Sequence, residues 1–188
     1  LEYFDPHEPF DAPQRYKDLY TDQPADFDWP MYEKVRDERQ LKEAIINYKA
    51  CVSMCDDYLG RMLDLFDEYN LWKDTLLIVN TDHGYLLGEH GYFAKNYMPC
   101  YDELTNIPFF IYDPRFKDVG GTRRKALAQT IDIAPTILSF FGIPIPPSMR
   151  GSSLQPIVET DTPIHDAVLY GYFGKHINVT DGRYTYMR

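Results

Sequence analysis

A short polar stretch behind an apolar run carries the residue types best suited to chemistry. Asp82 and His83 follow the apolar run 75–80 and open a glycine-rich segment that reaches Gly91. A carboxylate oxygen and a neutral imidazole nitrogen both coordinate divalent cations, and the carboxyl end of a buried strand is where open α/β sheets bind ligands. Asp82 and His83 are therefore candidate metal ligands. Two ligands do not complete a coordination shell, and an isolated Asp-His-Gly is more often a turn cap beside a surface histidine.

Two candidate cations accompany this pair. Lys95 lies twelve residues after His83, and His7 lies in a loop between Pro6 and Pro9. A lysine ammonium is a compact point charge, and flanking prolines hold a loop in an extended path that can aim a side chain. Each residue, taken alone, is equally well explained as solvated surface. A small anionic ligand would need a metal ion or a local cluster of cations to reverse the negative field of the chain in one pocket.

The charge of the chain argues against several partners. Its 188 residues include 19 Lys and Arg against 29 Asp and Glu, which gives a net charge of −10. Such a surface repels nucleic-acid phosphates and anionic lipids, so we expect no nucleic-acid and no membrane partner. No sequence run approaches the ~18 apolar residues of a membrane span. Three unevenly spaced cysteines form neither a disulfide framework nor a zinc ribbon, and they lean the expected localisation towards a reducing compartment such as the cytoplasm.

The elements that position the candidate residues follow from hydrophobic periodicity. After an irregular, loop-dominated stretch at 1–37, apolar residues recur at steps of three and four and predict a long amphipathic helix. Helices that alternate with short apolar runs predict the α/β class with a parallel sheet. The predicted elements are a helix at 38–69, buried strands at 75–80 and 108–113, a helix at 131–141, a strand at 168–172 and a hairpin at 176–187.

The extended motif around these residues resembles the sulfatase family of the alkaline phosphatase superfamily. D-H-G-Y-L-L-G-E-H-G-Y-F-A-K, at 82–95, is similar to the branch with an Asp-His metal pair, which includes iduronate sulfatase-like enzymes and phosphonate monoester hydrolases. Nearly the whole chain aligns, with its motifs in the family's order. The further matches are P-H-E-P-F-D-A-P at 6–13, a helix with D-Y-L-G at 57–60, an acidic turn and strand at 101–110, D-I-A-P-T at 132–136 and R-G-S-S-L at 150–154.

The resemblance implies a fold and a set of roles. The fold would be part of an alkaline phosphatase-like sandwich, a mainly parallel sheet flanked by helices and ending in an antiparallel hairpin. Residues 1–165 would be the carboxy-terminal portion of the catalytic domain, and residues 166–188 the start of a strand and hairpin region. Asp82 and His83 would bind one divalent cation, calcium by family resemblance, although imidazole also suits manganese or zinc. His7 and Lys95 would bind the sulfate of a small ester and take part in catalysis.

Two parts of the family's machinery are absent from the sequence. The family's nucleophile is a formylglycine made from the first residue of C/S-x-P-x-R, and none of Cys51, Cys55 and Cys100 begins that motif. The early Asp-Asp pair that completes the family's metal shell is also absent. We therefore expect the chain to be a carboxy-terminal half, inactive alone, whose partner is the amino-terminal half of the same protein.

Three readings of function stay open. The first is a metal-dependent sulfuric ester hydrolase, and the second is a phosphonate monoester or phosphodiester hydrolase on the same scaffold. The third is a non-catalytic binding or assembly module. His90, within the matched motif, either braces its loop or contacts substrate. The sequence does not indicate the substrate or the oligomeric state.

Overall fold

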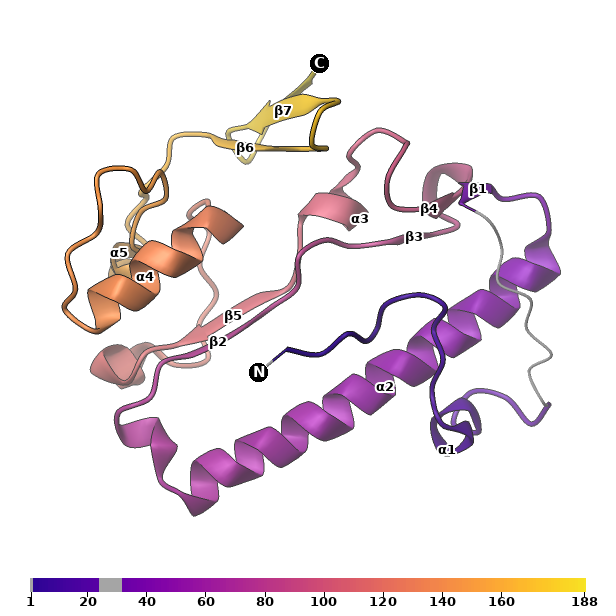
Figure 1. Cartoon of the computed structure of the whole chain (residues 1–188), viewed down its shortest axis with the longest axis horizontal. Helices are drawn as coiled ribbons and strands as arrows, with labels where there is room; N and C mark the ends of the chain where they lie inside the picture. The colour runs from indigo at the N-terminus through magenta and orange to yellow at the C-terminus, as the bar shows by residue number, and fades with distance from the viewer. Residues whose placement is uncertain (1, 24–31) are drawn as a thin grey trace. The chain divides into compact units, whose positions relative to one another are not determined.

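The structure is a computed structural model that describes residues 2–23 and 32–188 (Figure 1). The chain forms two compact units, residues 1–71 with 85–99 and residues 72–84 with 100–188. Residues 24–31 of the expected loop-dominated stretch lie outside the described residues. The predicted domain boundary after residue 165 does not coincide with the division into these units, and it stays a prediction.

One long helix, α2 (Glu38–Glu68), dominates the first unit, as the apolar periodicity predicted (Figure 1). Its first turn is capped by Asp37, whose carboxylate accepts hydrogen bonds from the backbone N–H groups of Arg39 and Gln40 at 2.9 and 3.2 Å. A capping side chain satisfies donors that have no partner within the helix. The short helix α1 (Gln14–Lys17) packs against α2.

Small residues occupy most of the buried positions of α2. Ala44, Ala50 and Cys51 are fully buried, and Asn47 and Phe66 are buried as well. Val52 is 41% exposed, so the apolar character of a position does not by itself decide which face of α2 is buried. The core cluster of this unit is Phe10, Ala12, Tyr16, Ala44, Ala50, Cys51 and Phe93.

Cys51 has a packing role in the core of the first unit. All three cysteines are free thiols, and Cys51 is fully buried. Burial raises the pKa of the Cys51 thiol to about 12, so this side chain is an uncharged apolar group at neutral pH.

The first unit contains a sheet of three short strands, and Lys95 directly follows its central strand. Strand β4 (Tyr92–Ala94) pairs antiparallel with both β1 (Glu33–Lys34) and β3 (Leu86–Leu87). Between β3 and β4 the chain makes a 3-10 turn at Glu89–Gly91. Phe93 and Ala94 are at most 3% exposed, so the residue after β4 is attached to a fixed part of the core.

The second unit contains a strand pair whose direction differs from the prediction. Strands β2 (Leu77–Asn80) and β5 (Phe109–Tyr112) occupy the two apolar runs but pair antiparallel, with Asn80 opposite Phe109. A parallel pair requires a crossover that returns the chain to the opposite end of the sheet. Here the chain leaves β2 and re-enters β5 at the same end, and every strand pair among the described residues is antiparallel.

The carboxy-terminal strands confirm the predicted hairpin. Strands β7 (Ile177–Thr180) and β8 (Thr185–Met187) pair antiparallel around Asp181 and Gly182, and β6 (Val168–Gly171) pairs with β7. No helix among the described residues has the length and apolar character needed to cross a bilayer. The other helical elements are α3 (Asp102–Thr105), α4 (Ile133–Phe140), α5 (Gln155–Thr160) and the 3-10 helices Leu71–Lys73, Pro114–Val119 and Thr130–Asp132.

The buried carboxylate of Asp132 holds together several segments of the second unit. Asp132 is fully buried, and its oxygens accept hydrogen bonds from the backbone N–H groups of Gln129 at 2.8 Å and Ser152 at 2.9 Å. The ring Nε2 of His165 also lies 2.8 Å from Oδ2. This one side chain therefore ties together segments 20 and 33 residues distant in the sequence.

We predict that Asp132→Ala lowers the free energy of unfolding by about 3 kcal/mol, because it leaves buried donors without an acceptor. Urea denaturation measures the change. Asp118→Ala, at an exposed position of the same unit, is the matched control and should change stability by less than about 0.5 kcal/mol. Equal stability of the two variants would contradict the central place given to Asp132.

Candidate active site

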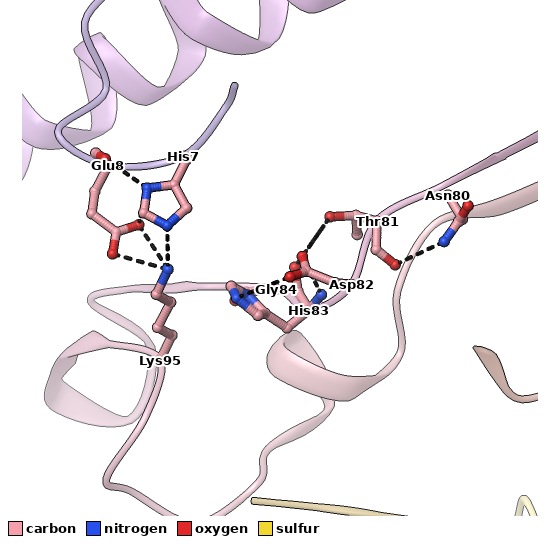
Figure 2. Close-up of polar contacts among 8 residues, drawn as sticks. All are labelled: His7, Glu8, Asn80, Thr81, Asp82, His83, Gly84 and Lys95. Atoms are coloured by element: carbon pink, nitrogen blue, oxygen red, sulfur yellow. Dashed lines mark hydrogen bonds and ion pairs between the residues drawn. The ribbon is translucent and has the colours of Figure 1, made fainter. Parts of the chain in front are cut away.

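Two of the predicted site residues meet in the first unit. The Nζ of Lys95 lies 2.9 Å from Nε2 of His7, which is 88 residues away in the sequence (Figure 2). The same Nζ lies 2.9 and 3.0 Å from the two carboxylate oxygens of Glu8. The side chains of Lys95 and Glu8 are only 13% and 11% exposed, whereas that of His7 is 36% exposed.

The hydrogen bonds of His7 assign its tautomer. The lysine ammonium only donates, so Nε2 of His7 accepts from Lys95. Nδ1 lies 2.7 Å from the backbone carbonyl oxygen of Glu8, which only accepts, so Nδ1 carries the proton. His7 is thus a neutral imidazole whose ring is held on both sides.

Backbone contacts fix the loop that carries His7. Its N–H donates to the carbonyl oxygen of Phe4 at 3.2 Å, and its own carbonyl oxygen accepts from the N–H of Phe10 at 3.2 Å. Phe10 is 1% exposed in the core, and the ring of Phe4 lies 4.4 Å from that of His7. Lys95 comes directly after β4, so the core holds both sides of the contact.

The other predicted pair lies in the second unit, just after β2. Nε2 of His83 is 3.6 Å from Oδ2 of Asp82, and Nδ1 of His83 is 2.9 Å from the carbonyl oxygen of Gly84 (Figure 2). A proton on Nδ1 satisfies that carbonyl, and in the neutral imidazole this tautomer keeps the lone pair on Nε2, which faces the carboxylate. Asp82 and His83 have side chains 84% and 43% exposed.

These two side chains suit a divalent cation as part of a larger donor set. A carboxylate oxygen and an unprotonated imidazole nitrogen on adjacent residues are ligands for calcium, manganese or zinc. Among the described residues, no group of three or more His, Cys, Asp or Glu side chains is placed to hold a metal ion. The pair therefore supplies part of a shell that needs further ligands.

Gly84 is required by a close approach of two backbones. A Cβ at Gly84 would lie 1.8 Å from the carbonyl oxygen of Glu103. The backbone N–H of Gly84 donates a hydrogen bond to the carbonyl oxygen of Leu104 at 2.9 Å. The segment after His83 is thus pressed against α3. The glycine of the Asp-His-Gly motif fixes where the preceding pair leaves the strand.

The sequence identified both pairs but not Glu8. The only feature of the sequence that pointed to Glu8 was its position next to His7. A carboxylate between a histidine and a proline is typical of an ordinary loop. His90 has left-handed backbone angles in the 3-10 turn before β4, which makes it part of the turn. The catalytic and metal-binding roles of His7, Lys95, Asp82 and His83 stay predictions.

Comparison with known proteins identifies the family. The sulfatase family model matches residues 3–143, which is most of the chain and includes all four predicted site residues. The chain belongs to the sulfatase family.

Two relatives of this sulfatase-family chain are named as sulfatases. An arylsulfatase of Clostridium perfringens is 31% identical over 199 aligned residues, covering 93% of this chain and 41% of the relative. An N-acetylglucosamine-6-O-sulfatase of Bacteroides thetaiotaomicron is 34% identical over 131 aligned residues, covering 68% of this chain and 23% of the relative. The sulfatase-family chain thus spans less than half the length of these curated relatives.

Solved structures confirm the alkaline phosphatase-like α/β fold. One, a protein in complex with its substrate D-glucosamine-2-N,6-O-disulfate, has a TM-score of 0.69 at 26% identity, covering 79% of this chain and 32% of that one. A phosphonate monoester hydrolase of Agrobacterium radiobacter has a TM-score of 0.79, covering 99% and 47%, and at 19% identity it shows the fold alone. Sulfatases as a family generally use a metal ion and formylglycine.

We predict that Gly84→Ala lowers the free energy of unfolding of this sulfatase-family chain by roughly 2 kcal/mol or more, because the added methyl group collides with backbone. Gly60→Ala is the control, since a Cβ there meets nothing within 4 Å and Gly60 lies inside α2. That control should raise stability by about 0.5–1 kcal/mol. Urea denaturation of both variants would expose an error if Gly84→Ala were neutral.

Proposed function

We propose that this chain is the carboxy-terminal part of a metal-dependent sulfatase that hydrolyses a small sulfuric ester, and that His7 and Lys95 bind its sulfate group. The observation that carries the proposal is the 2.9 Å contact between Lys95 and His7. It joins the two side chains that the family motifs selected on independent grounds. Membership of the sulfatase family supplies the reaction class.

The chemistry of the ester fits these side chains. Sulfuryl transfer places negative charge on the non-bridging oxygens and on the leaving oxygen, so catalysis depends on preorganised charge and hydrogen-bond donors. Lys95 brings a compact positive charge, and its ammonium can supply a proton to the leaving oxygen. His7 would turn its Nε2 to the sulfate when Lys95 engages substrate, and protonation of that nitrogen would make it a second donor.

Asp82 and His83 would hold the divalent cation. Nε2 of His83, in the neutral form of the ring, and the exposed carboxylate of Asp82 are the two donor groups offered to it. A bound cation would supply fixed positive charge for an anionic ester. We propose calcium from the family resemblance, with manganese or zinc as the alternatives that imidazole favours.

The remaining ligands and the formylglycine would come from the amino-terminal half of the same protein, which is the partner we propose. Support comes from length, because the chain covers 41% and 23% of the two sulfatase relatives above. The β2 and β5 pair supports it too, since two strands alone are marginally stable and Phe110 on β5 is 66% exposed. A further part of the sheet would cover this face.

The two other readings make different predictions for the same assay. A phosphonate monoester hydrolase would turn over a phenyl phosphonate ester faster than an aryl sulfate. A non-catalytic module would turn over neither when joined to its amino-terminal half. We expect the full-length protein to prefer the aryl sulfate, and the 188-residue chain alone to hydrolyse neither ester.

Lys95→Arg in the full-length protein should lower kcat for an aryl sulfate by roughly 10- to 100-fold. The guanidinium keeps the positive charge beside Glu8 but spreads it over a plane that does not reproduce the ammonium position. Thermal unfolding should change little, which separates this variant from Lys95→Ala, where Glu8 would lose its counter-charge.

The matched control is Lys17→Arg, the same exchange in the ion pair that Lys17 makes with the 84% exposed side chain of Asp11. It should leave kcat unchanged, since neither Lys17 nor Asp11 belongs to the proposed sulfate site. Full activity of Lys95→Arg would remove Lys95 from the reaction.

The metal assignment is checked by calorimetry as well as by activity. The 188-residue chain should bind calcium or manganese only weakly, with a Kd in roughly the millimolar range, since two ligands form an incomplete site. In the full-length protein, Asp82→Asn should weaken metal binding at least about tenfold. Asp74→Asn, at an exposed position before β2, is the control. Unchanged metal affinity in Asp82→Asn would refute the assignment.

A further inference from the structure

The carboxylate of Glu8 holds a position that the proposed reaction does not yet use. Both of its oxygens are within 3.0 Å of Nζ of Lys95, and Oε2 lies 3.3 Å from Nδ1 of His7. Its backbone carbonyl oxygen accepts the Nδ1 proton of His7 at 2.7 Å. One residue therefore contacts both of the side chains assigned to the sulfate.

Burial distinguishes this ion pair from an ordinary surface pair of the same unit. The two ammonium groups are similar, because the side chains of Lys95 and Lys17 are 13% and 17% exposed. The carboxylates differ: Glu8 is only 11% exposed, whereas Asp11, three residues further along the loop and 3.1 Å from Lys17, is 84% exposed. A carboxylate that is itself withdrawn from water is held in one place, so Glu8 determines where the ammonium of Lys95 lies. The Glu8 contact thus has a positional effect that the Asp11 contact lacks.

The charges show what Glu8 would contribute. With His7 neutral, the carboxylate cancels the charge of Lys95, so Glu8 weakens the attraction of the group for any anion in the ground state. Its benefit must then be geometric. It holds Nζ beside Nε2 of His7 and, with its own carbonyl, sets the ring orientation and tautomer of His7.

We infer that Glu8 is a positioning residue, which aims Lys95 and His7 at the sulfate and stays in place through the reaction. The inference rests on the proposed function, since it assigns a task only if these two side chains bind the ester. The opposing possibility is that Glu8 occupies the place of the anion and is displaced by substrate. The two differ in how kcat and KM respond to removal of the carboxylate charge.

Glu8→Gln in the full-length protein tests the inference with an aryl sulfate. Loss of the carboxylate frees the charge of Lys95 but releases its position, so kcat should fall by roughly 10- to 100-fold while KM stays equal or decreases. If Glu8 only competed with substrate, KM would decrease while kcat stayed equal or rose, and that result would overturn the inference. Asp11→Asn, the same exchange at the exposed pair, should change neither constant.

A second variant covers the case in which Glu8→Gln does not fold. Glu8→Asp keeps a negative charge near Lys95 but withdraws it by one methylene group, so its kcat should be roughly 3- to 10-fold lower than that of the wild type. Wild-type kcat in folded Glu8→Asp would show that the place of the carboxylate has no importance, and would also overturn the inference.

A spectroscopic readout separates this inference from the proposed function. Nitrogen-15 NMR of histidine-labelled protein, with His7 assigned by His7→Gln, reports on the hydrogen bond between Nζ of Lys95 and Nε2 of His7. The Nδ1-protonated tautomer, held by the backbone carbonyl of residue 8, should remain in both wild type and Glu8→Gln, whereas the Nε2 resonance should move towards that of a free imidazole in Glu8→Gln because Lys95 is no longer held beside it. If the wild type hydrolyses no sulfate ester, the proposed function fails, while the NMR comparison still reports whether Glu8 holds Lys95 against His7. An unchanged Nε2 resonance in Glu8→Gln would remove the positioning role.

Discussion

An ammonium group taken out of water needs acceptors inside the protein, and for Lys95 they come from a loop 87 residues away. This need joins the two ends of the first unit. Lys95 is attached to β4, whose neighbouring side chains are buried, and Glu8 and His7 are attached to a loop anchored by the buried Phe10. The apolar core therefore places Lys95 and Glu8 close enough to pair, and their pairing in turn holds the loop against β4.

The second unit solves a related problem with the opposite charge. Asp132 is fully buried, and its donors come from two backbone N–H groups and one histidine ring. Gly84 adds a constraint of space, since the backbone of α3 occupies the position a side chain would take. In both units, polar and glycine residues of the matched motifs have a structural role of their own. Glu8 balances the charge of Lys95 in the first unit, and Asp132 and Gly84 hold backbone segments together in the second.

The sequence predicted the elements well and the pairing of the strands less well. Periodicity located α2, the two apolar strands and the final hairpin, because each is a local pattern. The antiparallel pairing of β2 with β5 depends on the path of the intervening chain, which periodicity does not contain. Likewise, motif matching selected His7 and Lys95, but the part of Glu8 could only be seen once side chains distant in sequence were placed together.

The first unit is assembled from two stretches of chain with residues 72–84 between them. On a ribosome, the loop with His7 and Glu8 is made well before β4, so the carboxylate of Glu8 meets Lys95 only after the whole of α2 and the strand β2 have been synthesised. Until then Glu8 has to remain hydrated, and of the core around Phe10 only the part supplied by α2 is available to the loop. The last residues of this unit to leave the ribosome are thus the ones that close it.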